Sequence, residues 1–441
     1  MSAKATIGGI VTRVITSPNL RDGRRAIAGM KRKLSGSSAC VHYFHQTDDP
    51  YSHLMLQVLP ALLAGYQIEL RVHVAPVPTD AAAPDRERLK AWSRRDALVL
   101  ANTLSLSYTD ALKQPEAKQC ALAERALVAA FSDMPASREM LTKAQTISTA
   151  LWRADAVAIS GFNLASEVET VSALQAAAAL RQRLGHYLGG TLFFEGEWYW
   201  GIDRLHYLEQ RLAAAGLPKD AAQKPIAAVP NVSCTHQPTN GVRPDLHFFL
   251  SFRSPYTYIA APRVIQLAKH YDANLQLRFI LPMAMRGLAV PMEKRLYITR
   301  DTKREAETLG LRFGHIADPL GAPTERGLAV LHHAIQAGKG PEFALSFLQG
   351  VFADGIDAGS DKGLMKIAAR AGVEAGMVTT ALADASWRVV AETNRAEMFS
   401  AGLWGVPSFR VDSGRSYWGQ DRLWLIEQDL IAATAAKVRQ S

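Results

Sequence analysis

The residues best placed for chemistry follow the aromatic run 246–252, which we expect to be a buried strand. The run stops at Ser254, and Pro255 then opens a predicted helix, because proline suits the first turn of a helix. The Ser254 hydroxyl and the free backbone N–H groups of the helix start therefore meet at one point. The helix dipole makes that point attractive to an anion, including a thiolate.

The stretch 405–409 (GVPSF) should converge on Ser254, and its Pro407 opens a predicted strand. Proline cannot donate to the sheet ladder, and a cis bond here would turn the neighbouring backbone groups toward the helix start. Val406 could then pair with a peptide-like ligand as an added strand does. A proline is also common at a strand start without any ligand, and the sequence leaves both interpretations open.

The stretch 418–422 (WGQDR) should also converge on Ser254, at the point where a predicted hairpin meets the last helix. Asp421 lies near a helix N-terminus and is a natural cap. Capping accounts for this residue without a ligand. The functional alternative is that Asp421 or Gln420 also contacts an amino or carboxylate group of a bound molecule.

These stretches belong to a pattern that occurs twice along the chain. Around the hairpin the repeat spacing is 218, as in 199–201 and 417–419, which both read YWG. We interpret the chain as two tandem copies of one α/β domain, each reading strand, helix, strand, helical block, hairpin and closing helix. That order predicts a thioredoxin-like fold with a helical insertion. In the first part of the first copy, seven residues are identical to the residue 205 positions later in the second copy. They are His42, Phe44, Pro50, Tyr51, Tyr66, Arg95 and Asp96.

The repeat divides the chain into a basic arm at 1–37, a first domain at 38–216, a linker at 217–244 and a second domain at 245–441. The arm holds eight basic residues and one acidic residue, which is +7 of the net charge of +9. We interpret it as a solvated helix packing on the body rather than a nucleic-acid-binding segment, because it lacks interleaved aromatic residues. The linker is rich in Ala, Pro, Asn and Thr and lacks periodicity.

Cysteine usage and hydropathy limit the classes of function. Cys40, Cys120 and Cys234 are scattered and odd in number, which argues against a disulfide framework and for a reducing compartment. There is no CxxC motif, no Cys/His cluster with metal-ligand spacing and no apolar run long enough to span a bilayer. We therefore expect a cytoplasmic protein with no metal, no nucleic-acid partner and no membrane partner.

A set of motifs in a fixed order carries a family resemblance: SPYTY after an aromatic strand, PMEKRLY, RDTKREAETLG, GVPSF and YWGQDRLWLIEQDL. This set resembles the 2-hydroxychromene-2-carboxylate isomerases, which belong with the kappa-class glutathione transferases in the DsbA-like thioredoxin superfamily. The resemblance covers most of 245–435 and, more weakly, 40–215. One departure is the apolar segment 280–285 (ILPMAM), where relatives usually offer a polar group such as Asn.

In DsbA-type enzymes the helix start carries a C-P-x-C motif, whereas residues 254–257 of this chain are SPYT and include no cysteine. The resemblance therefore implies that glutathione supplies the sulfur. It implies that Ser254 is the catalytic residue and donates a hydrogen bond to the glutathione thiolate. It further implies that Val406 and Pro407 hold the cysteinyl backbone and that Lys294 meets the glycyl carboxylate. For Lys294, a solvated helix lysine is the alternative. The residues placed by the γ-glutamyl end are Gln420, Asp421 and Arg422.

The function implied is a glutathione-dependent isomerase or transferase that acts on a small aromatic or conjugated organic acid. The sequence does not distinguish these outcomes, because the second-substrate pocket lies in the variable helical block. The alternatives are a non-catalytic binding module and, ranked last, a thiol–disulfide oxidoreductase using Cys40 or Cys120. The two copies can pair within a monomer, or the chain can form a homodimer.

The first copy lacks the chemical signals of the second. At the positions of Ser254, Lys294 and Pro407 it has Asp49, Leu89 and Gly190. A carboxylate at the helix start would repel a thiolate. We expect the first copy to be a degenerate, structural partner of the second, with Asp49 as a helix cap rather than as a general base.

Overall fold

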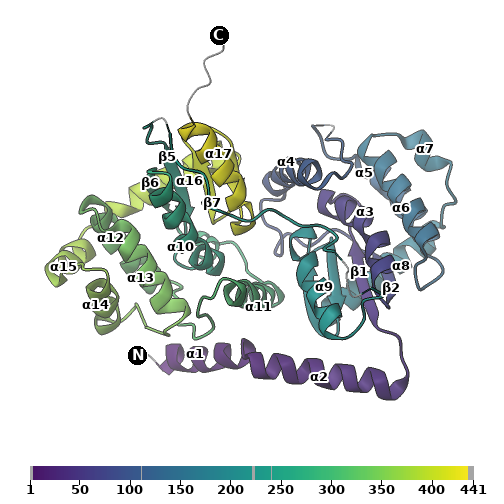
Figure 1. Ribbon diagram of the computed structural model, residues 1–441, viewed down its shortest axis with the longest axis horizontal. Coiled ribbons are helices and arrows are strands. Elements are labelled where there is room, and N and C mark those ends of the chain that lie inside the picture. The colour runs from purple at the N-terminus through teal and green to yellow at the C-terminus, as the bar shows by residue number, and fades with distance from the viewer. Residues whose placement is uncertain (1–2, 111, 221–223, 240, 436–441) are drawn as a thin grey trace, which may run out of the picture. The chain divides into compact units, whose positions relative to one another are not determined.

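The computed structural model describes residues 3–110, 112–220, 224–239 and 241–435 (Figure 1). The chain divides into two compact units. The N-terminal unit is Arg21–Val229, and the C-terminal unit is Met1–Leu20 together with Pro230–Ser441. In the described residues, no helix has both the length and the apolar character needed to cross a membrane.

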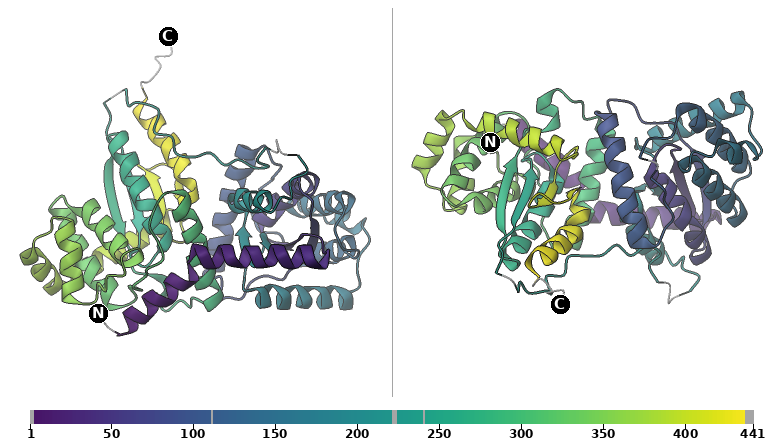
Figure 2. Two further views of the ribbon diagram at one scale, coloured as in Figure 1. Left: turned by 60° about the horizontal axis from the view of Figure 1, so that its bottom comes forward. Right: turned by 90° about the horizontal axis from the view of Figure 1, so that it is seen from above.

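The C-terminal unit is built on a four-stranded sheet with the order β6-β5-β7-β8. Its first two strands are parallel, as expected for strands joined by a helical crossover, and the hairpin strand β7 lies antiparallel to β5. The crossover helix and the closing helix both pack on this sheet (Figure 2). These elements are β5 (Asp245–Leu250), α10 (Pro255–His270), β6 (Asn274–Phe279), β7 (Ser408–Val411), β8 (Ser416–Trp418) and α17 (Leu423–Thr434).

A helical block is inserted between β6 and β7, as the sequence predicts. Its core meets the end of β5 through stacked aromatic rings, with the Phe252 and Phe347 centroids 4.0 Å apart. Two 3₁₀ turns flank the block and the hairpin, η2 (Met283–Arg286) and η3 (Gln420–Arg422). The helices are α11 (Met292–Thr308), α12 (Ala322–Gln336), α13 (Gly340–Phe352), α14 (Asp361–Arg370), α15 (Ala375–Ala383) and α16 (Trp387–Ser400).

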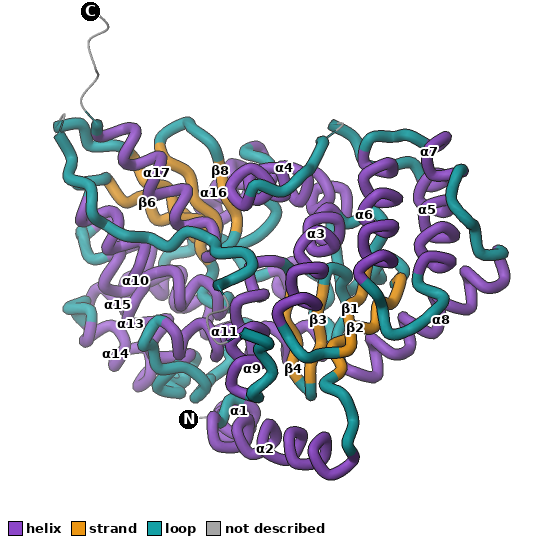
Figure 3. The backbone as a smooth tube through the Cα atoms, turned by 45° about the vertical axis from the view of Figure 1, so that its right-hand side comes forward, coloured by secondary structure: helices purple, strands orange, loops and turns teal. Residues whose placement is uncertain are grey.

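The N-terminal unit has a second four-stranded sheet with the equivalent order β2-β1-β3-β4, flanked by helices (Figure 3). The pairing repeats as well, because β1 and β2 are parallel and β3 is antiparallel to β1. Its elements up to the helical block are β1 (Cys40–His45), α3 (Pro50–Gly65) and β2 (Glu69–Val74). The block and hairpin follow as α4 (Arg86–Leu104), α5 (Ala117–Ala130), α6 (Arg138–Trp152), α7 (Ala156–Ser160), α8 (Glu167–Leu184), β3 (Thr191–Phe194), β4 (Glu197–Trp200), η1 (Ile202–Arg204) and α9 (Leu205–Ala214).

The basic arm consists of two helices, α1 (Ala3–Ile15) and α2 (Pro18–Ser35), which serve different units. Helix α1 packs in the C-terminal unit, where the Thr12 hydroxyl accepts from the Ile316 N–H at 3.2 Å. Beyond Leu20, helix α2 belongs to the N-terminal unit, where Arg25 donates two hydrogen bonds to Glu197 at 2.5 and 2.7 Å. The positive charge of the second helix is thus partly neutralised by acidic side chains of its own unit.

The segment 217–244 forms no helix or strand in its described parts, apart from one bridge between Tyr66 and Pro218. Its second half is tied to α17, because Glu427 accepts from the Ser233 N–H at 2.7 Å. Glu427 also accepts from the buried Tyr271 hydroxyl at 3.1 Å. Tyr66 and Glu209, the residues at the equivalent positions, make the corresponding bond at 3.3 Å in the N-terminal unit.

Candidate active site

Ser254 is the N-cap of α10, and Pro255 is the first residue of that helix. Its hydroxyl oxygen accepts from the Thr257 N–H at 3.2 Å, which satisfies one of the free donors of the helix start. The same hydroxyl donates toward the Val406 carbonyl oxygen at 3.4 Å. The strand end, the helix start and the GVPSF loop therefore meet at Ser254.

The loop before β7 brings an aromatic pair to this point. The Val406–Pro407 peptide bond is cis, and Trp404 packs edge-on against Trp418 with ring centroids 5.1 Å apart. Gly405 fits closely here, since a Cβ at this residue would lie 3.2 Å from the Trp418 ring. The loop is thereby fixed against the hairpin that follows it.

Lys294 lies beside this loop rather than in open solvent. Its Nζ is 5.6 Å from the centroid of the Trp404 ring, and burial lowers the pKa of Lys294 to about 8. A desolvated ammonium over an aromatic face is a suitable partner for a carboxylate. The structure thus places Lys294 against Trp404, two residues before Val406 in the sequence.

Three buried polar groups near Ser254 have no hydrogen-bond partner within the described part of the chain. They are the Ser251 hydroxyl, the Thr257 hydroxyl and the indole N–H of Trp404. Buried polar groups normally find partners, but atoms without one occur throughout both units, so these three do not by themselves indicate a ligand. Sequence reasoning missed all three, although Trp404 directly precedes the GVPSF motif.

Gln420 lies in the interior, where it is 2% exposed. Its amide oxygen accepts from Arg263 at 2.7 Å, and its amide nitrogen donates to Glu305 at 3.0 Å. Arg422 is likewise buried, at 3% exposure. Gln420 therefore ties the corner after the hairpin to α10 and α11, and its two amide atoms already have protein partners.

Asp421 is half-buried and accepts from the Gln420 amide. The cap positions of η3 and α17 are Gly419 and Arg422, so the expectation that Asp421 caps a helix is wrong. Of the three residues expected at the γ-glutamyl end, Asp421 has the most exposed side chain.

The equivalent helix start in the N-terminal unit holds the Asp49 carboxylate. Asp49 caps α3, accepting from the Ser52 N–H at 2.9 Å and from the Ser52 hydroxyl at 2.7 Å. Burial nevertheless raises the pKa of Asp49 to about 6. Gly190, at the position of Pro407, has φ +63°, and a Cβ there would lie 3.0 Å from the Asp49 carboxylate. The carboxylate thus lies close to the loop, at a point that would repel a thiolate.

The known proteins that resemble this chain match less than half of it. Residues 245–430 match the model of the DSBA-like thioredoxin domain. No curated protein matches the chain. Similar solved structures include a probable DsbA oxidoreductase from Streptomyces coelicolor, at 21% identity over 45% of this chain and 93% of that chain, with a TM-score of 0.37.

Two further solved structures cover 42% of this chain. A 2-hydroxychromene-2-carboxylate isomerase is 18% identical, is itself covered over 93% of its length and has a TM-score of 0.37. The cytosolic disulfide reductase DsbM from Pseudomonas aeruginosa, with GSH, is 20% identical, is covered over 98% and has a TM-score of 0.31.

Proposed function

We propose that the DSBA-like thioredoxin domain at 245–430 binds glutathione at Ser254 and is a glutathione-dependent isomerase or transferase for a small aromatic or conjugated organic acid. The observation that carries this proposal is the meeting of the Ser254 hydroxyl, the N-terminus of α10 and the Val406 backbone in a domain that contains no cysteine. Such a site can bind a thiolate but cannot supply one.

In this proposal the sulfur comes from a bound thiol, since all three cysteines lie outside 245–430. Burial raises the pKa of the Cys120 thiol to about 12 and also raises the pKa of Cys40. Neither is paired with another cysteine. These facts give little support to the alternative of thiol–disulfide exchange by Cys40 or Cys120.

Each residue of the cluster has a defined task in this proposal. Ser254 donates a hydrogen bond to the bound thiolate, and the dipole of α10 favours the same negative charge, so both lower the pKa of the thiol. Val406 and Pro407 present the loop backbone to the cysteinyl residue of the ligand. Lys294, held beside Trp404, meets the glycyl carboxylate.

The remaining residues complete the γ-glutamyl end. Asp421, the most exposed of the three, would meet the ligand amino group. Gln420 and Arg422 act as positioning residues, since both are buried and Gln420 ties the turn after the hairpin to α10 and α11. When bound, glutathione would supply a nucleophile that adds to a conjugated double bond and is also a good leaving group.

Calorimetry with glutathione on the full chain tests the proposal, together with the ultraviolet absorbance of the bound thiolate as a function of pH. Ser254→Ala should weaken binding and raise the pKa of the bound thiol, because one charge-assisted hydrogen bond of about 1.5–3 kcal/mol is lost. Asp49→Asn, the matched change in the N-terminal unit, should alter neither quantity. A folded wild-type protein that binds no glutathione would contradict the proposal.

The binding-module alternative has one observation in its favour. The segment after β6 is apolar, and within it Met283 and Met285 are half-buried where relatives usually offer a polar group. A turnover assay distinguishes the enzyme from the binding module. If the domain is an enzyme, a conjugated enone acid incubated with protein and glutathione should isomerise or form an adduct. Binding of glutathione without any turnover across such acids would favour the module.

A further inference from the structure

The outer face of the N-terminal sheet carries a chain of three side chains that the proposed glutathione site does not use. Cys40 and His42 lie on one face of β1, since side chains two residues apart share a face. The Cys40 Sγ is 3.6 Å from His42 Nε2. On the neighbouring strand, His73 Nε2 is 3.0 Å from His42 Nδ1, and the two imidazole rings stack with centroids 5.2 Å apart.

The two contacts of His42 are consistent with one arrangement of protons. If the Cys40 thiol donates to Nε2, then the His42 proton is on Nδ1 and is donated to His73 Nε2. Burial lowers the pKa of His42, with a smaller effect from Arg71, and burial lowers the pKa of His73 to about 4. Both imidazoles are therefore neutral near neutral pH, and His42 is available as a base.

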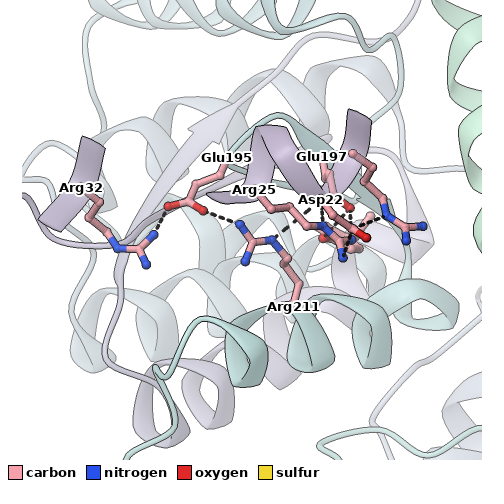
Figure 4. A network of polar contacts seen from close by, with 8 residues as sticks. Asp22, Arg25, Arg32, Glu195, Glu197 and Arg211 are labelled. Carbon is pink, nitrogen blue, oxygen red and sulfur yellow. Dashed lines mark hydrogen bonds and ion pairs between the residues drawn. The ribbon is translucent and has the colours of Figure 1, made fainter. Parts of the chain in front are cut away.

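A hollow of about 610 Å³ is lined by Cys40, by residues from the end of α2 that include Lys31 and Arg32, and by Glu195 of the hairpin turn. The lining carries a net positive charge, because it contains Lys31 and Arg32 but only one carboxylate, Glu195. Glu195 is itself shared between Arg32 and Arg211 (Figure 4). Burial raises the pKa of the Cys40 thiol, while on β2 Arg71 lowers it and Glu69 raises it. The thiol is therefore protonated near neutral pH and needs a base in order to react. A small anion is favoured at such a place.

The C-terminal unit shows that the fold does not require this arrangement. The residues 205 positions later are Asp245, His247 and Arg278. There Asp245 accepts from Asn274 at 2.7 Å, and the Arg278 Nε faces His247 Nδ1 at 3.3 Å. A permanent cation thus takes the place of the second imidazole, and no nucleophile is present at the first position.

We propose that Cys40 is a nucleophile for a small anionic electrophile, with His42 as the base that takes its proton and His73 as the positioning residue that orients His42. In the reaction a bond forms between Sγ and the electrophilic carbon, and the leaving group departs with its bonding electron pair. The thiol proton moves to His42 Nε2 and then to solvent. No oxidant or reductant is needed. Nucleophile, base and orienting group in hydrogen-bonded series are the arrangement that activates cysteine or serine in enzymes.

The pH dependence of Cys40 alkylation in the full chain tests this proposal. Iodoacetamide and iodoacetate serve as the neutral and anionic probes, and peptide mass spectrometry reports Cys40 and Cys234 separately. Burial raises the pKa of the Cys234 thiol, and within the described residues this thiol has no hydrogen bond to an imidazole. The Cys234 rate should therefore rise about tenfold per pH unit as the thiolate fraction grows. Cys40 should instead react at a nearly constant rate between about pH 6.5 and pH 8, because a neutral base assists the thiol.

Three variants test the separate roles of His42, His73 and Lys31. His42→Phe should lower the Cys40 rate near neutral pH by about tenfold or more and give it the profile of Cys234. His73→Phe should have a smaller effect in the same direction. Lys31→Gln should reduce the preference for iodoacetate over iodoacetamide. A Cys40 rate in the wild type that rises tenfold per pH unit would overturn the proposal, whether or not the variants fold.

Discussion

The hydroxyl of Tyr256 donates to the carboxylate of Asp301 at 2.7 Å, and the same bond occurs 205 residues earlier, where Tyr51 donates to Asp96 at 2.8 Å. In each unit the bond joins the crossover helix to the first long helix of the helical block. Both carboxylates are buried, at 0% and 4% exposure. Two positions that recur in the sequence thus make the same polar contact twice, which supports the interpretation of the chain as a tandem repeat.

Tyr256→Phe should destabilise the C-terminal unit by about 1–3 kcal/mol, because a buried carboxylate loses a donor while the ring volume is kept. Tyr51→Phe is the matched change and should destabilise the N-terminal unit by a similar amount. Hydrogen exchange followed peptide by peptide locates each effect in its own unit. Equal protection in the variants and the wild type would show that these bonds contribute nothing to stability.

The strands and hairpins could be predicted because their signals are local. The run before Ser254 became β5, and the turn at Gly196, with φ +91°, separates β3 from β4 as expected. The roles of single polar residues were less predictable. Gln420 is a polar residue at a predicted helix start, where exposure to solvent is expected, yet it is buried. Its partners Arg263 and Glu305 lie 157 and 115 residues away in the sequence. Periodicity indicates which face a residue occupies but not which distant side chain it meets.

The same limit applies to Lys294 and Cys40. Helical periodicity is compatible with a solvated lysine, whereas the structure places Lys294 over Trp404, which is 110 residues further along the chain. Cys40 opens a strand, and a free cysteine at such a position is typical of a small core residue. Its partner His73 comes from the neighbouring strand, and only the parallel register of β1 and β2 brings the two histidines together.

Lys294→Met should weaken the binding of S-methylglutathione by about tenfold, because an ammonium that meets the glycyl carboxylate is removed. In the wild type, affinity should fall as pH rises through about 8, since the pKa of Lys294 is lowered to about 8 and only the protonated form attracts the carboxylate. The S-methyl ligand is used because it has no titrating thiol, and calorimetry measures the affinity.

Lys303→Met is the matched control for this experiment. Lys303 lies further along the same helix and pairs with Glu307 at 3.4 Å, so its removal should leave the affinity and its pH profile unchanged. If the wild type and Lys294→Met gave the same affinity at every pH, Lys294 would have no part in the site.

Asp49→Asn should stabilise the N-terminal unit near pH 7 but not near pH 4. Burial raises the pKa of Asp49 to about 6 in the folded state, above its ordinary value of 3.8. The folded state therefore binds more protons than the unfolded state between these two values, and the free energy of unfolding falls as pH rises from about 4 to 6. The loss in the wild type is on the order of 2–3 kcal/mol.

The asparagine variant removes the titrating group but keeps an oxygen that can accept from the Ser52 N–H, so the helix cap is retained. Urea unfolding of both proteins at several pH values measures the difference. A difference between them that does not change with pH would mean that Asp49 is solvated and titrates normally in the folded protein.

Glu195→Gln should loosen α2 from the hairpin of the N-terminal unit. Glu195 accepts from Arg211 at 2.6 Å and is also paired with Arg32, while Glu197 holds Arg25 (Figure 4). Arg211 is only 6% exposed, so the loss of one anionic partner leaves a largely buried cation less compensated. We expect a destabilisation of about 1–3 kcal/mol and faster hydrogen exchange in residues 21–35.

Asp22→Asn gives the contrast for this network. The Asp22 side chain is 58% exposed and lies 3.7 Å from Arg25, so its removal should change stability by less than about 0.5 kcal/mol. The two variants lose the same charge, and they differ in whether the carboxylate is buried against guanidinium groups. If both variants destabilised the unit equally, net charge rather than these particular contacts would hold α2 in place. The attachment of the α2 residues that line the hollow beside Cys40 would then weaken as salt concentration rises.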